Sequence, residues 1–163
     1  MTSPPASRTT GSDRALAFSE LRYLVLAAQR EGNRALIKLL APLELTPAQA
    51  EILLVLHSFG PLTLRSLGEM IVCEAGSPSR IVDMLVTRRL VHRRPSPSDR
   101  RAVQLELTEA GAELVPHLQD IEAGLEAHTA SILTAREQLD VASALRKYLQ
   151  GTDSEGVIER RFR

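Results

Sequence analysis

Arginine is concentrated in one short part of the sequence. Between Pro78 and Arg101 there are seven arginines and two aspartates, which gives this stretch a local net charge of +5. A guanidinium can donate two parallel hydrogen bonds to a phosphate or to guanine, so the cluster is suited to binding a polyanion. Residues 108–155 instead carry a net charge of −6. The charge indicates a polyanionic partner on one face, or else two solvated faces of opposite sign.

The rest of the composition is typical of one globular domain, with 44% hydrophobic and 25% charged residues in 163. No apolar run approaches the roughly 20 residues of a membrane span, and residues 1–12 lack the apolar core of a signal peptide. The single cysteine, Cys73, excludes an internal disulfide and fits a reducing compartment. We therefore expect a cytoplasmic protein without membrane association or a cofactor.

The first half of the domain is expected to be helical. Helical periodicity covers residues 13–40. Thr46-Pro47-Ala48-Gln49 forms a capping box with proline at the first helical position, and this second helix should stop before Gly60. Thr63 can cap a third helix, and a fourth is expected over about residues 77–88.

The pattern then changes to that of strands before it becomes helical again. Residues 90–94 and 102–107 are short strand-like runs around a turn with two prolines, which predicts a β-hairpin with a basic tip. Thr108 is expected to cap a long helix that contains Pro116, and Thr134 to begin a last helix with a second capping box.

This order of elements, helix, helix, turn, helix and hairpin, is that of a winged helix-turn-helix. The expected fold class is mainly α with a small β-hairpin wing, flanked by long N- and C-terminal helices. In such a fold an exposed helix enters the major groove of DNA and a basic hairpin reaches the neighbouring minor groove. The fourth helix suits this role, because Ser77, Ser79 and Arg80 stand at its start.

The most specific segment is residues 99–111, DRRAVQLELTEAG. It resembles the wing signature of the MarR family of bacterial transcription regulators, which reads D-x-R, three residues, L-x-L-T-x-x-G. The similarity continues upstream through Leu67-Gly68-Glu69, residues 79–85 and Leu90-Val91. It spans residues 46–111 in total, whereas the flanking helices match only the layout of the family.

The resemblance implies a set of DNA contacts on the fourth helix and the hairpin. Asp99 would orient the guanidinium of Arg101, which would enter the minor groove; the alternative is a salt bridge within the wing only. The other arginines of the hairpin would contact phosphates. The expected contact residues are Ser77, Ser79, Arg80, Arg93, Arg94, Asp99, Arg100 and Arg101.

A homodimer on a pseudo-palindromic operator is also implied, because members of the family pair through their first and last helices. The expected organisation is a disordered N-terminus (1–12), one domain (13–150) and a flexible tail (151–163). Within the domain, 13–45 and 112–150 would be dimerisation helices and 46–111 the DNA-binding lobe. The expected interface residues are Leu21, Leu24, Leu114, Leu118, Ile121, Leu125, Leu139, Leu145 and Leu149.

Two positions depart from the family pattern. The family usually has glycine where Val72 and Arg89 stand, before and after the fourth helix. A side chain at a helix end with positive φ costs about 1 kcal/mol when that geometry is kept. The two turns are therefore expected to be strained or built differently.

A sensor function rests on weaker signals. Many MarR-like proteins release DNA when a small, often phenolic or aromatic, ligand binds, and Tyr23 and His57 are candidate contacts if they are not core residues. Cys73 is expected to be a buried, inert thiol, although its place beside the fourth helix leaves a redox response open. His117 and His128 lie about 16 Å apart on one helix, too far to share a metal ion.

Enzyme function is not expected, because the sequence has no nucleophile elbow, no phosphate-binding glycine loop and no H-E-x-x-H motif. The sequence predicts a DNA-binding transcription regulator, a homodimeric repressor released from its operator by a small ligand. Alternatives are a redox-responsive regulator acting through Cys73, or a winged-helix dimer that binds a ligand or protein without specific DNA binding. The arginine-rich hairpin argues against the last.

Overall fold

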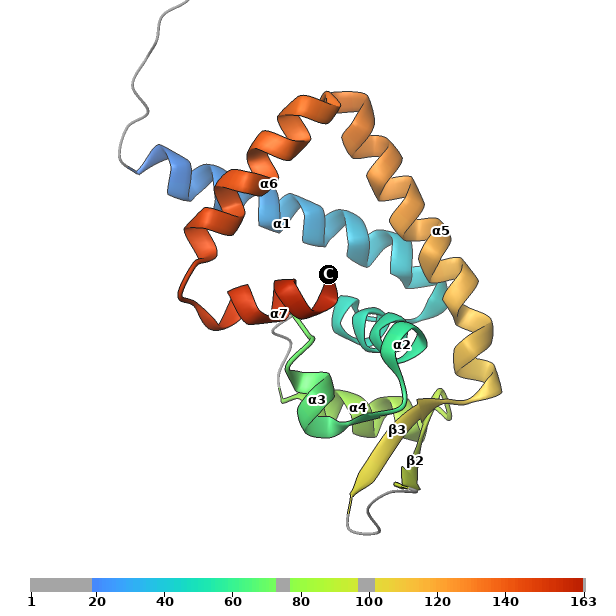
Figure 1. Cartoon of the computed structure of the whole chain (residues 1–163). Helices are drawn as coiled ribbons and strands as arrows, with labels where there is room; N and C mark the ends of the chain where they lie inside the picture. Colours follow the sequence, from blue (N-terminus) through green and yellow to red (C-terminus); the bar gives the residue numbers. More distant parts are fainter. Residues whose placement is uncertain (1–18, 73–76, 97–101, 163) are drawn as a thin grey trace, which may run out of the picture. The chain divides into compact units, whose positions relative to one another are not determined.

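The computed structural model describes residues 19–72, 77–96 and 102–162 (Figure 1). The chain divides into two compact units, residues 1–35 and 36–163. The first described helix, α1 (Glu20–Leu40), begins in the smaller unit and ends in the larger one. All its side chains up to residue 35 are exposed, apolar ones included. The disorder expected for residues 1–12 lies outside the described residues.

Helix α2 (Pro47–Phe59) forms the centre of the larger unit, after a short 3-10 turn, η1 (Ala41–Leu43). Its predicted capping box is confirmed: the Thr46 hydroxyl accepts a hydrogen bond from the Gln49 amide at 3.3 Å, and the Gln49 side chain accepts one from the Thr46 amide at 3.0 Å. Most apolar side chains of α2 belong to the hydrophobic core, so burial holds this helix in place, whereas Phe59 at its end is exposed.

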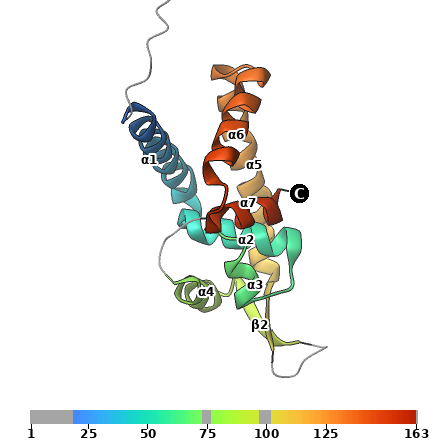
Figure 2. The ribbon, with the colours of Figure 1, turned by 60° about the vertical axis from the view of Figure 1, so that its left-hand side comes forward.

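The helix-turn-helix follows α2. Strand β1 (Leu62–Thr63) leads into α3 (Leu64–Gly68), and α4 (Pro78–Thr87) is the expected fourth helix. The Thr63 hydroxyl caps α3 by accepting from the Ser66 amide at 3.1 Å. Both helices pack against α2 in the larger unit, where Figure 2 shows them on the same side of α2 as the hairpin.

The predicted hairpin is confirmed as β2 (Val91–Pro95) and β3 (Val103–Leu107). The strands are antiparallel, with Val91 opposite Leu107 and Pro95 opposite Val103. Strand β1 pairs with the other edge of β3, which gives the sheet order β1-β3-β2. The third strand was not predicted, because a run of two residues has no readable period.

Helix α5 (Glu109–Ile132) begins where β3 ends, and Thr108 caps it by accepting from the Gly111 amide at 3.0 Å. Glycine is required at this start, because a Cβ on Gly111 would lie 2.0 Å from the carbonyl oxygen of Leu90. The wing signature therefore contains a glycine that lets the backbones of α5 and the α4–β2 turn approach each other.

Helix α6 (Ala135–Leu149) has the second predicted capping box. The hydroxyl and the backbone amide of Thr134 both donate to the carboxylate of Glu137. These bonds lower the pKa of Glu137, and the bond from the hydroxyl has the larger effect. Residues 151–163 differ from the expected flexible tail, because Asp153–Arg161 form a further helix, α7. Its arginines bind α2 and the end of α3, contacts that the sequence of a polar tail does not reveal.

No single helix among the described residues is long and apolar enough to cross a membrane. Helices α1 and α2 meet the length and composition criteria only as a bent pair, and most of α2 is buried in the core of the larger unit.

Candidate DNA interface

Helix α4 has one buried face and one exposed face. Ile81, Val82 and Leu85 are almost completely buried in the core, while Arg80 and Asp83 are exposed. Burial of three apolar side chains at helical spacing fixes the rotation of the helix about its axis. The polar face of α4 is therefore presented to solvent in one defined orientation.

The start of α4 offers hydrogen-bonding groups to an anion. Ser77 is the N-cap residue, and its side chain makes no capping hydrogen bond. Its hydroxyl lies 2.6 Å from the Ser79 hydroxyl, so one donates to the other and the second keeps a free proton. The first backbone amides of a helix have no intrahelical acceptor and carry partial positive charge. With Arg80 exposed beside them, these groups can bind a phosphate or a base edge.

The wing strand β2 is tied to α4 by an ion pair. Arg93 Nη2 lies 2.6 Å from Asp83 Oδ1 on the exposed face of α4. On the same strand, His92 Nε2 lies 2.9 Å from Glu106 Oε2, and Arg94 Nε lies 3.5 Å from that oxygen. These contacts make Asp83 and Glu106 positioning residues for the hairpin, which could not be read from the sequence because the partners lie 10 to 14 residues apart.

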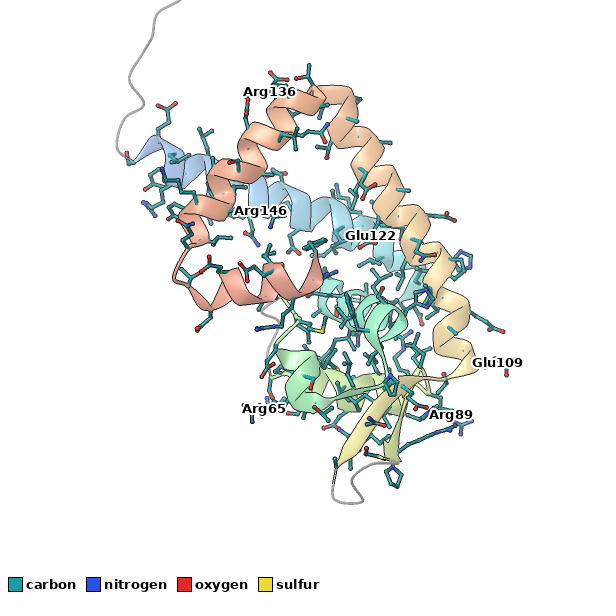
Figure 3. The ribbon with its side chains drawn as sticks, viewed as in Figure 1. Arg65, Arg89, Glu109, Glu122, Arg136 and Arg146 are labelled. Carbon is teal, nitrogen blue, oxygen red and sulfur yellow. The ribbon has the colours of Figure 1, made fainter. Side chains whose placement is uncertain are left out.

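The turn after α4 keeps the geometry of a glycine cap although it contains arginine. Arg89 has a φ of 57°, the Leu90 amide donates to Leu85 O at 2.9 Å, and the Arg89 amide donates to Val86 O at 2.9 Å. Both bonds define a Schellman motif. The side chain of Arg89 is exposed (Figure 3).

The turn before α4 is different. Among the described non-glycine residues only Glu44 and Arg89 have positive φ, so Val72 does not adopt the conformation that favours glycine. Its amide donates to Glu51 Oε1 at 2.9 Å. The departure at Arg89 thus produces strain, whereas Val72 avoids positive φ and produces none.

Several predicted residues lie outside the described ones. They are the wing-tip residues Asp99, Arg100 and Arg101, and the candidate redox residue Cys73. The minor-groove contact of the wing and the redox response stay predictions. Within the described part of the chain, no group of three or more histidine, cysteine, aspartate or glutamate side chains is arranged to hold a metal ion.

Comparison with known proteins identifies this arrangement. Residues 45–103 match the model of the MarR family. The HTH-type transcriptional regulator YhbI of Bacillus subtilis is 34% identical over 107 residues, which cover 65% of this chain and 70% of YhbI. The chain belongs to the MarR family. Its members are transcription regulators and not enzymes, as the sequence analysis expected.

The multiple antibiotic resistance protein MarR of Escherichia coli is 29% identical over 130 residues, which cover 79% of this chain and 90% of that protein. A crystal structure of a mutant of that protein in complex with operator DNA superimposes with a TM-score of 0.72 at 28% identity, and the match covers 83% of this chain and 99% of that one. The MarR resemblance and the winged helix-turn-helix fold expected from the sequence are thus confirmed.

The larger unit of this MarR-family chain contains a cavity of about 130 Å³ lined by α2, α5, α7 and the end of α1. Apolar side chains dominate its lining, and Glu51, Glu122 and Arg161 add charged groups. Neither predicted effector contact lines it: His57 is exposed on α2, and Tyr23 is exposed in the smaller unit with the Arg22 guanidinium 4.4 Å from its ring.

The predicted dimer residues fall into two groups. Leu118 is only 1% exposed, so it serves the interior of one subunit and has no surface for the predicted dimer contact, because α2 covers that face of α5. Leu114 and Ile121 pack against the same core but are only partly buried, and their dimer contact stays a prediction. The others remain available to a partner, with Leu125 and Leu149 half-buried and four exposed: Leu21, Leu24, Leu139 and Leu145.

Proposed function

We propose that this protein binds a pseudo-palindromic operator in double-stranded DNA as a homodimer, with α4 in the major groove. The observation that carries the proposal is the geometry of α4: its apolar face is buried, and Ser77, Ser79 and Arg80 stand at its exposed start. The wing, held to α4 by Asp83 and Arg93, would follow the adjacent backbone and reach the minor groove with Arg101.

Two further observations support this function. The Escherichia coli MarR mutant, which is 28% identical in its superimposed part, was crystallised with operator DNA. Helices α1 and α6 expose large apolar side chains, and such faces are expected to be covered by a second subunit. Two recognition helices related by a dimer axis would read half-sites about one helical turn apart.

The test is a fluorescence-anisotropy titration against the DNA upstream of the protein's own gene and a scrambled duplex, at two salt concentrations. We expect preference for the upstream duplex and a steep salt dependence, with a slope of about −0.9 per neutralised phosphate. Arg80→Ala should weaken specific binding by about 10-fold or more, the loss expected for one bidentate base contact. Arg136→Ala on α6 removes the same charge from an exposed site and should bind normally.

Equal, weak binding to both duplexes, together with no enrichment of any duplex from a random pool, would instead support a winged-helix dimer without specific DNA binding. Equal affinity of Arg80→Ala and Arg136→Ala for the specific duplex would contradict the assignment of α4 as the recognition helix.

We also propose that the protein is a repressor released by a small aromatic ligand, and that the ligand binds in the cavity lined by α2, α5, α7 and the end of α1. The support is its size and lining, since apolar cavities of about 150 Å³ accept one benzene ring. Phenol and benzoate are suitable probes. Filling the cavity by Leu54→Phe should abolish release by the probe and leave DNA binding intact; release that persists in this variant would place the site elsewhere.

A further inference from the structure

Helix α7 is attached to the DNA-binding lobe by its last two arginines. Arg161 Nη1 pairs with Glu51 Oε1 of α2, and both side chains are shielded, at 17% and 6% exposure. Arg160 Nε donates to the carbonyl oxygen of Glu69, just after α3, at 3.0 Å. In Figure 1 the C-terminal end of α7 lies next to α2.

The carboxylate that binds α7 also holds the turn of the helix-turn-helix. Glu51 Oε1, the oxygen bonded to Arg161, accepts the Val72 amide at 2.9 Å. Val72 lies five residues before Ser77, the N-cap of α4. One oxygen atom thus bonds both to Arg161, 110 residues away in sequence, and to Val72, 21 residues away.

Stability alone gives a poor reason for this arrangement. A buried ion pair stabilises a fold little more than well-packed apolar side chains of the same size, because both charges lose their hydration. What such a pair does provide is a fixed position, since the hydrogen bonds are directional and the loss of one partner leaves a buried charge. Here the fixed elements are the backbone at Glu69 and at Val72, both in the segment between α3 and α4.

We propose that α7 is a strap that positions the recognition helix, and that Arg161 and Glu51 are its positioning residues. With the strap in place, the backbone at Val72 has one position, and the exposed start of α4 meets DNA in one register. Without it, Glu51 loses the Arg161 guanidinium, and the carboxylate oxygen that accepts from the Val72 amide is held less firmly. The inference rests on the proposed DNA binding by α4 and assigns to α7 the control of its geometry.

The experiment compares Arg161→Met with Arg161→Lys and with Arg136→Met, the control that removes an exposed arginine of α6. Operator affinity is measured by anisotropy on the duplex that the full-length wild-type protein enriches, and non-specific affinity on a scrambled duplex. We expect Arg161→Met to bind the operator about tenfold more weakly, as for loss of one well-oriented contact, with unchanged non-specific binding. Arg161→Lys should restore most of the affinity, and Arg136→Met should match the wild type.

Hydrogen exchange of the Val72 amide gives a readout that does not require DNA. Its protection should fall in Arg161→Met at a temperature where the variant remains folded, and stay at the wild-type level in Arg136→Met. If Arg161→Met does not fold, the double variant Glu51→Gln/Arg161→Met removes both charges and retains an oxygen for the Val72 amide. It should fold and still lose operator preference.

If Arg161→Met binds the operator with wild-type affinity, or if it leaves the exchange protection of the Val72 amide unchanged, the proposal that α7 positions the recognition helix is overturned. Absence of operator preference in the wild type would contradict the proposed function instead, while the exchange measurement would still decide whether α7 holds the turn.

Discussion

Arg89 offers a direct test of the backbone geometry after the recognition helix. It has a φ of 57° at the C′ position of a complete Schellman motif, where a Cβ meets the neighbouring carbonyl. The left-handed conformation costs an L residue about 1–2 kcal/mol. Glycine avoids this cost, but the greater conformational entropy that it gives the unfolded chain lowers the free energy of unfolding by about 0.4–1 kcal/mol. Arg89→Gly should therefore raise the free energy of unfolding by about 0.5–1 kcal/mol.

The assay is thermal unfolding at fixed protein concentration, because the Tm of a dimer depends on concentration. For a chain of this size the expected gain corresponds to a rise in Tm of about 1–4 °C. Arg89→Ala is the matched control, since it removes the same exposed guanidinium and keeps the Cβ. If the glycine variant is no more stable than the alanine variant, strain at this turn is refuted and the Schellman geometry contributes nothing measurable.

Three further predictions follow from the packing of α5 and α6. Gly111→Ala should lower the free energy of unfolding by about 2–3 kcal/mol, because its Cβ would lie 2.0 Å from Leu90 O. An unchanged Tm in thermal unfolding would show that the two backbones can separate. Leu118→Glu should prevent folding, whereas Leu139→Glu, at a site 69% exposed, should give a folded monomer by size-exclusion chromatography; a folded Leu118→Glu monomer would contradict the burial. The lowered pKa of Glu137 stabilises α6 above the ordinary glutamate pKa of about 4.3, and this contribution is lost as the pH falls through the lower folded pKa. Accordingly, the Tm difference between wild type and Glu137→Gln should shrink at low pH, and a constant difference would contradict the capping assignment.

The helix starts could be read from sequence because capping is local. Thr46, Thr108 and Thr134 each hydrogen bond to a residue three positions later, so side chain and acceptor lie within one short segment. The hairpin was predictable for a similar reason, since its strands adjoin in sequence and alternate in hydrophobicity.

Features that depend on distant contacts were not readable. The sequence of α5 and that of α6 each show one apolar stripe, but neither stripe indicates what covers it. In the structure Leu118 of α5 is buried against α2 of its own subunit, whereas Leu139 of α6 is exposed to solvent. The polar residues of α7 indicate a tail, and only the contact of Arg161 with Glu51 explains why this segment is an ordered helix. Burial between elements far apart in sequence decides such cases.

The charge of the candidate interface is a further feature that depends on contacts invisible in the sequence. The net charge counts all arginines between residues 78 and 101 alike, but three of the five that the structure describes are already engaged. Arg88 Nη1 donates to Glu44 O at 2.6 Å, Arg93 pairs with Asp83, and Arg94 lies beside Glu106. Among the arginines of residues 77–96, only Arg80 and Arg89 have side chains without a hydrogen-bond or ion-pair partner. Engaged guanidiniums orient the wing and the helix ends, and they release fewer counterions per residue than free ones. The arginine cluster therefore builds the shape of the interface as much as its charge.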